Sequence, residues 1–146
     1  MTTSIVRSAQ EQSRLAALVA EYEASLPPEL RHDYVPVADG SSNVAILATL
    51  EGAPEGCVFI SRFDNESAIV QRLYVRPQAR GHGLARALMQ QVADHARVHG
   101  YRRLILDTDK AQLQAAYRLY LSLGFTECAA FGPVPYEHPT YMELLL

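Results

Sequence analysis

The stretch LYVRPQARGHGLARALM, residues 73–89, joins an apolar run to a helix-like pattern through a turn that contains two glycines. Gly81 and Gly83 carry no side chains, so a ligand can approach the backbone N–H groups of this turn closely. The first N–H groups of a helix lack internal partners, and the helix dipole is positive at that end. The stretch therefore predicts an anion site, most of all for a phosphate or a pyrophosphate.

Two common phosphate-binding motifs do not fit this stretch. A Walker A loop requires Gly-Lys-Ser/Thr, which the sequence does not contain. A dinucleotide fingerprint requires glycine or alanine at the position of Arg86, and it would follow the first strand of a doubly wound sheet. Arg80 and Arg86 instead place positive charge next to the glycines. A phosphate ligand of another kind is therefore expected.

Hydrophobic patterning predicts strands and helices on both sides of the stretch. The expected strands are residues 4–7, 43–50, 56–62, 68–75, 103–108, 125–130 and 140–145, and the expected helices are residues 9–26, 84–99 and 112–123. Residues 29–42 are expected to form a loop, or a short helix followed by a loop. The strands before and after the 84–99 helix should be parallel, as in other strand–helix–strand units. We predict one α/β domain over residues 1–146 with a mixed sheet.

Charge and hydropathy exclude two classes of partner. The net charge is −3, without the basic excess or stripe of nucleic-acid binders. No apolar run approaches the roughly 20 residues that span a bilayer. The N-terminal residues 1–12 lack an apolar signal core, so a cytoplasmic protein is expected.

The cysteines and histidines do not indicate a metal site. Cys57 and Cys128 form no CxxC pair and have no histidine at ligand spacing, so both are expected to be reduced, buried thiols that pack as small apolar groups. His95 and His99 lie one helical turn apart, but no third ligand accompanies them. We expect no metal.

Two motifs resemble the GNAT superfamily of N-acetyltransferases. Arg80-Gly81-His82-Gly83-Leu84-Ala85 is similar to its Arg/Gln-x-x-Gly-x-Gly/Ala motif, and the preceding LYVRP resembles its fourth strand. LYLSLGF, residues 119–125, resembles its Leu-Tyr-x-x-Leu-Gly-Phe segment. The resemblance implies an α+β fold with a mixed, mostly antiparallel sheet of six to seven strands. About four helices would accompany the sheet, which would be splayed between its fourth and fifth strands.

The resemblance also implies acetyl-coenzyme A, or a related acyl-CoA, as the donor. The pantetheine arm would lie in the splay and bind main-chain groups, and the pyrophosphate would lie on the amides of the glycine turn. A backbone N–H of the fourth strand would polarise the thioester carbonyl, a kind of stabilisation worth roughly 3–4 kcal/mol. The implied cofactor-binding residues are Leu73, Tyr74, Val75, Arg80, Gly81, His82, Gly83, Leu84, Ala85 and Arg86, with Tyr117 beside the donor.

Tyr120 matches the family tyrosine that protonates the departing coenzyme A thiolate, and it is the implied catalytic acid. The glutamate that many members carry on the fourth strand is missing, because the comparable positions, 69–71, read Ile-Val-Gln. An ammonium group, with a pKa near 10, must lose a proton before it attacks. The proton acceptor stays open between water and four side chains: Glu66, Asp107, Glu137 and His138.

The sequence thus indicates an acetyl-CoA-dependent N-acetyltransferase that acts on a primary amine of a small molecule by direct attack. The alternatives are a protein N-terminus or lysine as acceptor, a non-catalytic acetyl-CoA-binding regulatory domain, and a nucleotide binder unrelated to coenzyme A. A homodimer is an expectation from the resemblance alone. Residues 26–39 and the PVPYEHPTY loop would wall the acceptor site, with polar contacts from Arg31, His32, Tyr34, Tyr136, His138 and Tyr141, and Arg31 or Arg72 could hold a carboxylate.

Overall fold

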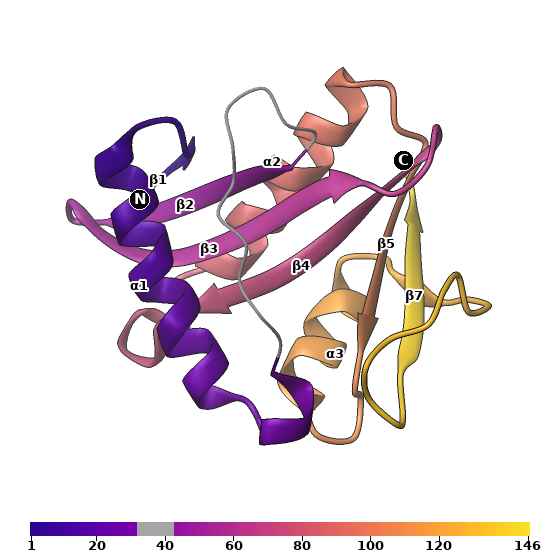
Figure 1. Ribbon diagram of the computed structural model, residues 1–146. Coiled ribbons are helices and arrows are strands. Elements are labelled where there is room, and N and C mark those ends of the chain that lie inside the picture. Colours follow the sequence, from indigo (N-terminus) through magenta and orange to yellow (C-terminus); the bar gives the residue numbers. More distant parts are fainter. Residues whose placement is uncertain (32–42) are drawn as a thin grey trace.

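A mixed sheet with the strand order β1-β2-β3-β4-β5-β7-β6 forms the centre of the protein (Figure 1). The structure is a computed structural model that describes residues 1–31 and 43–146. The strands are β1 (Thr2–Ile5), β2 (Val44–Leu50), β3 (Ala53–Arg62), β4 (Ser67–Val75), β5 (Arg103–Thr108), β6 (Thr126–Glu127) and β7 (Thr140–Leu145). Only β4 and β5 pair in parallel, and the other neighbours are antiparallel.

Two long helices cover opposite faces of the sheet (Figure 1). The helices of the described part are α1 (Ala9–Ser25), α2 (Leu84–Val98) and α3 (Gln114–Ser122), with the 3₁₀ turns η1 (Pro28–Leu30) and η2 (Pro77–Ala79). A capping box of Ser8 and Glu11 starts α1. The core under α2 holds the apolar stripe predicted from the four-residue spacing: Leu84, Leu88, Val92 and Ala96.

The sheet splits between β4 and β5. Their pairing covers only Ser67–Ile69 against Arg103–Ile105. Beyond this point β4 follows β3 while β5 follows β7, so the two strands diverge toward their carboxyl ends (Figure 1). Arg72, at φ 53°, forms part of an irregularity in the β3–β4 register, of the kind that bends a strand. The expected α+β fold with splayed strands is confirmed.

Several predicted boundaries were wrong. Only Thr126–Glu127 of the expected strand 125–130 pairs with β7, and the chain then leaves the sheet as a loop that ends at Pro139. The expected helix 112–123 begins at Gln114, because the Asp109 carboxylate binds the N–H groups of Ala111 and Gln112 in a turn before it. The first strand is Thr2–Ile5 rather than 4–7.

The predicted turn at 51–55 is shorter than expected. Glu51 and Gly52 form it alone, with φ values of 52° and 81°, the signs required by a tight two-residue hairpin. Pro54 already belongs to β3. Residues 29–42 were expected to form a loop, or a short helix followed by a loop. The described part of this segment, residues 29–31, contains the end of the turn η1. Within the described ranges, no helix has the length and hydrophobicity that a membrane crossing requires.

Candidate active site

The glycine turn leads directly into α2. Gly81 and Gly83 have φ values of 82° and 79°, in the left-handed region, and a Cβ atom on either would meet nothing within 4 Å. The backbone conformation, not a lack of space, therefore requires glycine at both positions. Gly83 is the N-cap of α2, and no side chain caps this helix. The first N–H groups of α2 are thus available to an anion.

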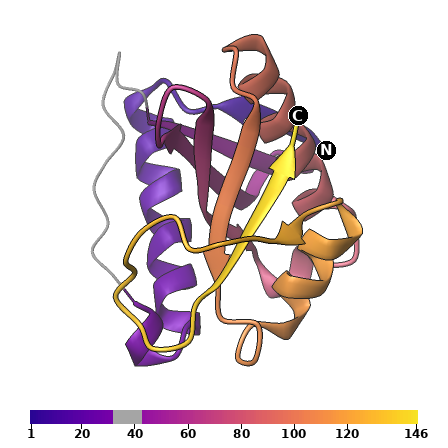
Figure 2. The same cartoon turned by 90° about the vertical axis from the view of Figure 1, so that its right-hand side faces the viewer.

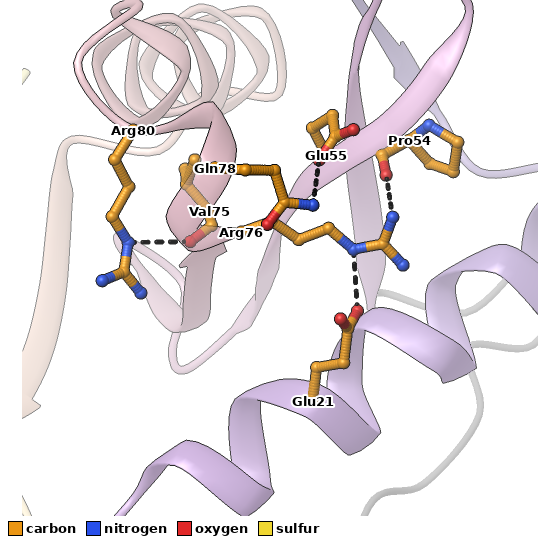
Figure 3. Close-up of polar contacts among 7 residues, drawn as sticks. All are labelled: Glu21, Pro54, Glu55, Val75, Arg76, Gln78 and Arg80. Atoms are coloured by element: carbon orange, nitrogen blue, oxygen red, sulfur yellow. Dashed lines mark hydrogen bonds and ion pairs between the residues drawn. The ribbon is translucent and has the colours of Figure 1, made fainter.

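Hydrogen bonds fasten the turn to the end of β4 (Figure 3). The Arg80 Nε donates to the Val75 carbonyl at 3.0 Å. Arg76 binds the Glu21 carboxylate of α1 at 2.8 Å and the Pro54 carbonyl of β3 at 3.1 Å, so its charge is already paired. Arg86 donates to the Ser122 Oγ at 3.0 Å, which links the first turn of α2 to α3. Arg80 and Arg86 are exposed and add positive charge near the start of α2.

Gly83→Ala tests the turn. An alanine forced into the left-handed region costs about 1–2 kcal/mol, and loss of contacts to an anion should raise the Kd for acetyl-CoA about tenfold. Gly100→Ala is the matched control, because Gly100 ends the same helix with φ 80° and equally open space. The two variants should lose similar thermal stability, and only Gly83→Ala should weaken donor binding in calorimetry. Equal donor affinity in both would contradict a ligand at this turn.

The open edge of β4 offers main-chain groups rather than side chains. The Arg76 N–H donates to the Glu55 carbonyl of β3 at 2.8 Å. Because pairs alternate along an antiparallel ladder, the N–H and C=O of Val75 point away from β3, toward the split. The Tyr74 side chain is buried under α1, with its ring 5.7 Å from that of Tyr22. Backbone groups on a strand edge need partners; the Val75 carbonyl already accepts the Arg80 Nε, and a ligand with amide groups can pair with the other groups of this edge.

A cavity occupies the split between β4 and β5. Its walls come from both faces of the sheet: Tyr22, Leu26 and Leu30 from α1 and η1, Val70–Leu73 from β4, Leu106–Asp109 from β5 and the residue after it, Leu113, Ala116 and Tyr120 at α3, and Tyr136 from the loop before β7. Burial raises the pKa of Tyr120, and the neighbouring charges of Tyr22 and Asp107 act in the same direction. The Tyr120 hydroxyl therefore keeps its proton at neutral pH.

Tyr117, one turn earlier on α3, has a different environment. Its hydroxyl donates to the Glu127 Oε2 at 2.7 Å, and this hydrogen bond raises the pKa of Tyr117. Tyr117 is not among the residues that line the cavity. Lys110 also binds Glu127, so these three side chains form a cluster of their own on the surface.

Of the four side chains considered as proton acceptors, Asp107 is the one that lines the cavity. Glu66 is exposed at the residue before β4. The side chains of Glu137 and His138 are 91% and 83% exposed and pair with each other. The sequence alone did not separate these candidates, although the alternation Leu104-Ile105-Leu106-Asp107 places Asp107 on the face of the sheet opposite α2.

The loop between β6 and β7 brings a partner to Asp107. The Tyr136 hydroxyl donates to the Asp107 Oδ2 at 2.8 Å. Burial and this hydrogen bond raise the pKa of Tyr136, so it stays a donor. The Tyr141 hydroxyl holds the same loop through the Gly132 carbonyl at 2.6 Å. Figure 2 shows the loop extending across the molecule toward η1, and Tyr136 and Leu30 line the same cavity.

Arg31 and Arg72, which were also predicted to contact the acceptor, both bind other groups of the protein. Arg31 donates to the Leu26 and Ala24 carbonyls at the end of α1, which accounts for its place there. Arg72 lines the cavity but pairs with Glu23 at 3.3 Å. His32 and Tyr34 lie outside the described residues.

The cysteines and histidines form no visible metal cluster in the described chain. No group of three or more histidine, cysteine, aspartate or glutamate side chains in residues 1–31 and 43–146 could hold a metal ion. Both cysteines are free. Cys57 is buried as expected, which raises the pKa of its thiol to about 12, whereas Cys128 is only partly buried because it lies just beyond the short strand β6. The rings of His95 and His99 stack at 4.1 Å on α2.

The uncapped start of α2 lies beside the open edge of β4 in a split α+β sheet, an arrangement suited to a long ligand that carries phosphate groups. Residues 7–125 match the sequence profile described as "Acetyltransferase (GNAT) family". The chain belongs to this family.

Relatives and solved structures agree with this assignment. The chain is 34% identical to an uncharacterized N-acetyltransferase of Schizosaccharomyces pombe over 94 residues, 64% of this chain and 57% of that protein. It is also 34% identical to the human N-acetylaspartate synthetase over 85 residues, 58% of this chain and 28% of that protein. These alignments span well under two thirds of the relatives' length. A GNAT-family acetyltransferase of Staphylococcus aureus shares the fold, with a TM-score of 0.75, 16% identity and 99% of both chains covered.

Proposed function

We propose that the protein is an acetyl-CoA-dependent N-acetyltransferase and that its acceptor is the primary amine of a small molecule. The observation that carries the proposal is the cavity in the split, where Tyr120 and Asp107 line one space beside the open edge of β4. The glycine turn would hold the donor's pyrophosphate. Main-chain groups of residues 73–75, above all the N–H of Val75 that points toward the split, would bind the pantetheine arm. The name of one relative, N-acetylaspartate synthetase, describes an acetylated small molecule and supports a small-molecule rather than a protein acceptor; it does not bear on the groups next to the amine.

Asp107 and Tyr120 would divide the proton transfers between them. A neutral amine attacks the thioester carbonyl, and its nitrogen then carries a positive charge and becomes strongly acidic. Asp107, oriented by the Tyr136 hydroxyl, accepts one proton from this nitrogen directly or through water. The carbon–sulfur bond then breaks, Tyr120 donates its proton to the thiolate, and solvent restores the starting protonation. The proton that Asp107 accepts balances the proton that Tyr120 gives up, so the neutral amine and acetyl-CoA yield the amide and coenzyme A with its thiol protonated.

The surroundings of Tyr120 bear on this role. A raised pKa keeps the tyrosine protonated but makes transfer to an ordinary thiolate less favourable. A thiolate released in the same cavity is also deprived of water, which raises its own pKa and reduces the mismatch. The presence of both a proton donor and an acceptor in one cavity favours turnover over a regulatory domain that only binds acetyl-CoA.

Calorimetric titration with acetyl-CoA, with ATP and NAD as controls, tests the donor. We expect acetyl-CoA to bind at least tenfold more tightly than either control, since only coenzyme A carries the pantetheine arm that fits the open edge of β4. Release of coenzyme A with added amines then tests transfer. Equal affinity for all three ligands would mean that the turn binds phosphates generally and that the proposal is wrong.

A further inference from the structure

A second cavity adjoins the first. Its lining comes from the residue after β3, from β4 and β5, and from the loop before β7: Phe63, Ile69, Gln71, Asp107, Phe131, Gly132, Pro133, Val134 and Pro135. Gln71 and Asp107 also line the cavity in the split, so the two spaces meet at these residues. A molecule with its nitrogen at Asp107 would therefore extend into the second cavity.

The wall of the second cavity is aromatic and well supported. The rings of Phe63 and Phe131 meet edge to face at 5.5 Å, and Phe131 meets Tyr141 in the same way at 4.8 Å. The Tyr141 hydroxyl binds the Gly132 carbonyl, which fastens the loop that carries this wall. Phe63 is nevertheless 42% exposed, so apolar surface faces the open space. Such surface binds apolar groups and favours aromatic rings in an edge-to-face arrangement.

The described lining of the second cavity carries negative charge and no positive charge. Among the described residues that line the second cavity, Asp107 is the one charged side chain. Arg72 lines the first cavity and is a cation that could face an acceptor carboxylate. Its guanidinium group, however, pairs with Glu23 and lies 5.8 Å from the centre of the Phe59 ring. A carboxylate next to the reacting amine would thus lie beside Asp107, where like charges repel, and Arg72, the one cation among the described residues that line the two cavities, is already paired with Glu23.

We propose that the acceptor is a primary amine on an apolar, uncharged group, such as an arylalkyl amine, and that a carboxylate beside the amine is selected against. This inference rests on the proposed function. The amine nitrogen lies at Asp107 and the apolar group fills the space between Phe63, Phe131 and Val134.

Three acceptors test separately the preference for an apolar group and the selection against a carboxylate beside the amine. Ethylamine lacks the ring of 2-phenylethylamine, and L-phenylalanine adds a carboxylate to it. With saturating acetyl-CoA, kcat/KM measured by coenzyme A release should be at least about tenfold higher for 2-phenylethylamine than for either of the others. Ethylamine or L-phenylalanine used as well as 2-phenylethylamine would overturn the inference and leave the proposed function intact.

A charge introduced into the wall provides the second test. Val134→Arg should lower kcat/KM for 2-phenylethylamine at least about tenfold and narrow its advantage over L-phenylalanine, because the new cation can pair with a carboxylate. Val98→Arg is the matched control, since Val98 is 81% exposed at the end of α2. Unchanged selectivity in Val134→Arg would overturn the inference.

Direct binding distinguishes this inference from the proposed function. Titration of the wild type with 2-phenylethylamine, without acetyl-CoA, should give a Kd that Val134→Arg raises and Val98→Arg leaves unchanged. If 2-phenylethylamine binds in this way but no acetyl transfer is found, the apolar acceptor cavity is supported and the proposed function is contradicted. If other amines are acetylated but 2-phenylethylamine does not bind in this way, the inference about the acceptor is contradicted and the proposed function stands.

Discussion

Tyr120→Phe is expected to lower kcat about a hundredfold or more, because general acid catalysis typically contributes a factor of about 10²–10⁴. The substitution removes one hydroxyl and keeps the ring, which packs 5.8 Å from the ring of Phe125 in the core. The fold and the donor site at the start of α2 should therefore be preserved. Steady-state kinetics would measure kcat, and calorimetry would measure an unchanged Kd for acetyl-CoA.

A second tyrosine serves as the control for this loss. Tyr101 follows the end of α2, packs against the same core and lies beneath the Arg62 guanidinium at 5.1 Å. Tyr101→Phe removes an equivalent hydroxyl far from the split and should retain wild-type kcat. If Tyr120→Phe turned over at the wild-type rate, Tyr120 would be a packing residue and the thiolate would take its proton from water.

Asp107→Asn is expected to lower kcat/KM for the amine by about 10²–10³-fold. The amide keeps the shape of the carboxylate and can still accept the Tyr136 hydrogen bond, so the loop before β7 should stay in place. What it loses is the negative charge that attracts the amine and the lone pair that accepts its proton. Rates at increasing pH would show a partial recovery, since a larger fraction of the amine then arrives neutral.

Asp94→Asn separates the role of Asp107 from a general effect of charge. Asp94 is exposed on α2 and pairs with Arg97 at 3.5 Å, so its loss changes the net charge by the same amount at a distant place. Its kinetics should match the wild type. Comparable losses in the two variants would show that the negative surface, rather than a positioned carboxylate, determines the rate.

The glycine turn and the elements around it could be predicted because their signals are local. The positive φ of Gly81 and Gly83 belongs to the residue itself, and the apolar stripe of α2 repeats at a fixed spacing. β5 and β7 were predicted to the residue; each is a short run rich in apolar side chains, interrupted by Asp107 in β5 and by Glu143 in β7. The strand expected at 125–130 failed because a strand needs a partner, and β7 accompanies it for two residues only.

The composition of the cavity could not be predicted in the same way. Asp107 meets Tyr136 across 29 residues, and the aromatic wall joins Phe63 to Phe131. Tyr117 and Tyr120 are three residues apart on one helix, yet one contacts Glu127 at the surface and the other lines the split. The rotation of α3 about its own axis decides between them, and packing against the core sets that rotation.

By itself, the sequence determined the glycine turn, the α2 helix and the family to which this chain is similar, because each depends on residues that are close along the chain. Only the tertiary structure decided which acidic side chain shares a space with Tyr120 and what surrounds the acceptor. The reason is physical: the split opens where β4 and β5 cease to pair, and its walls come from α1, α3 and the loop before β7. Such long-range contacts follow from the packing of the whole sheet.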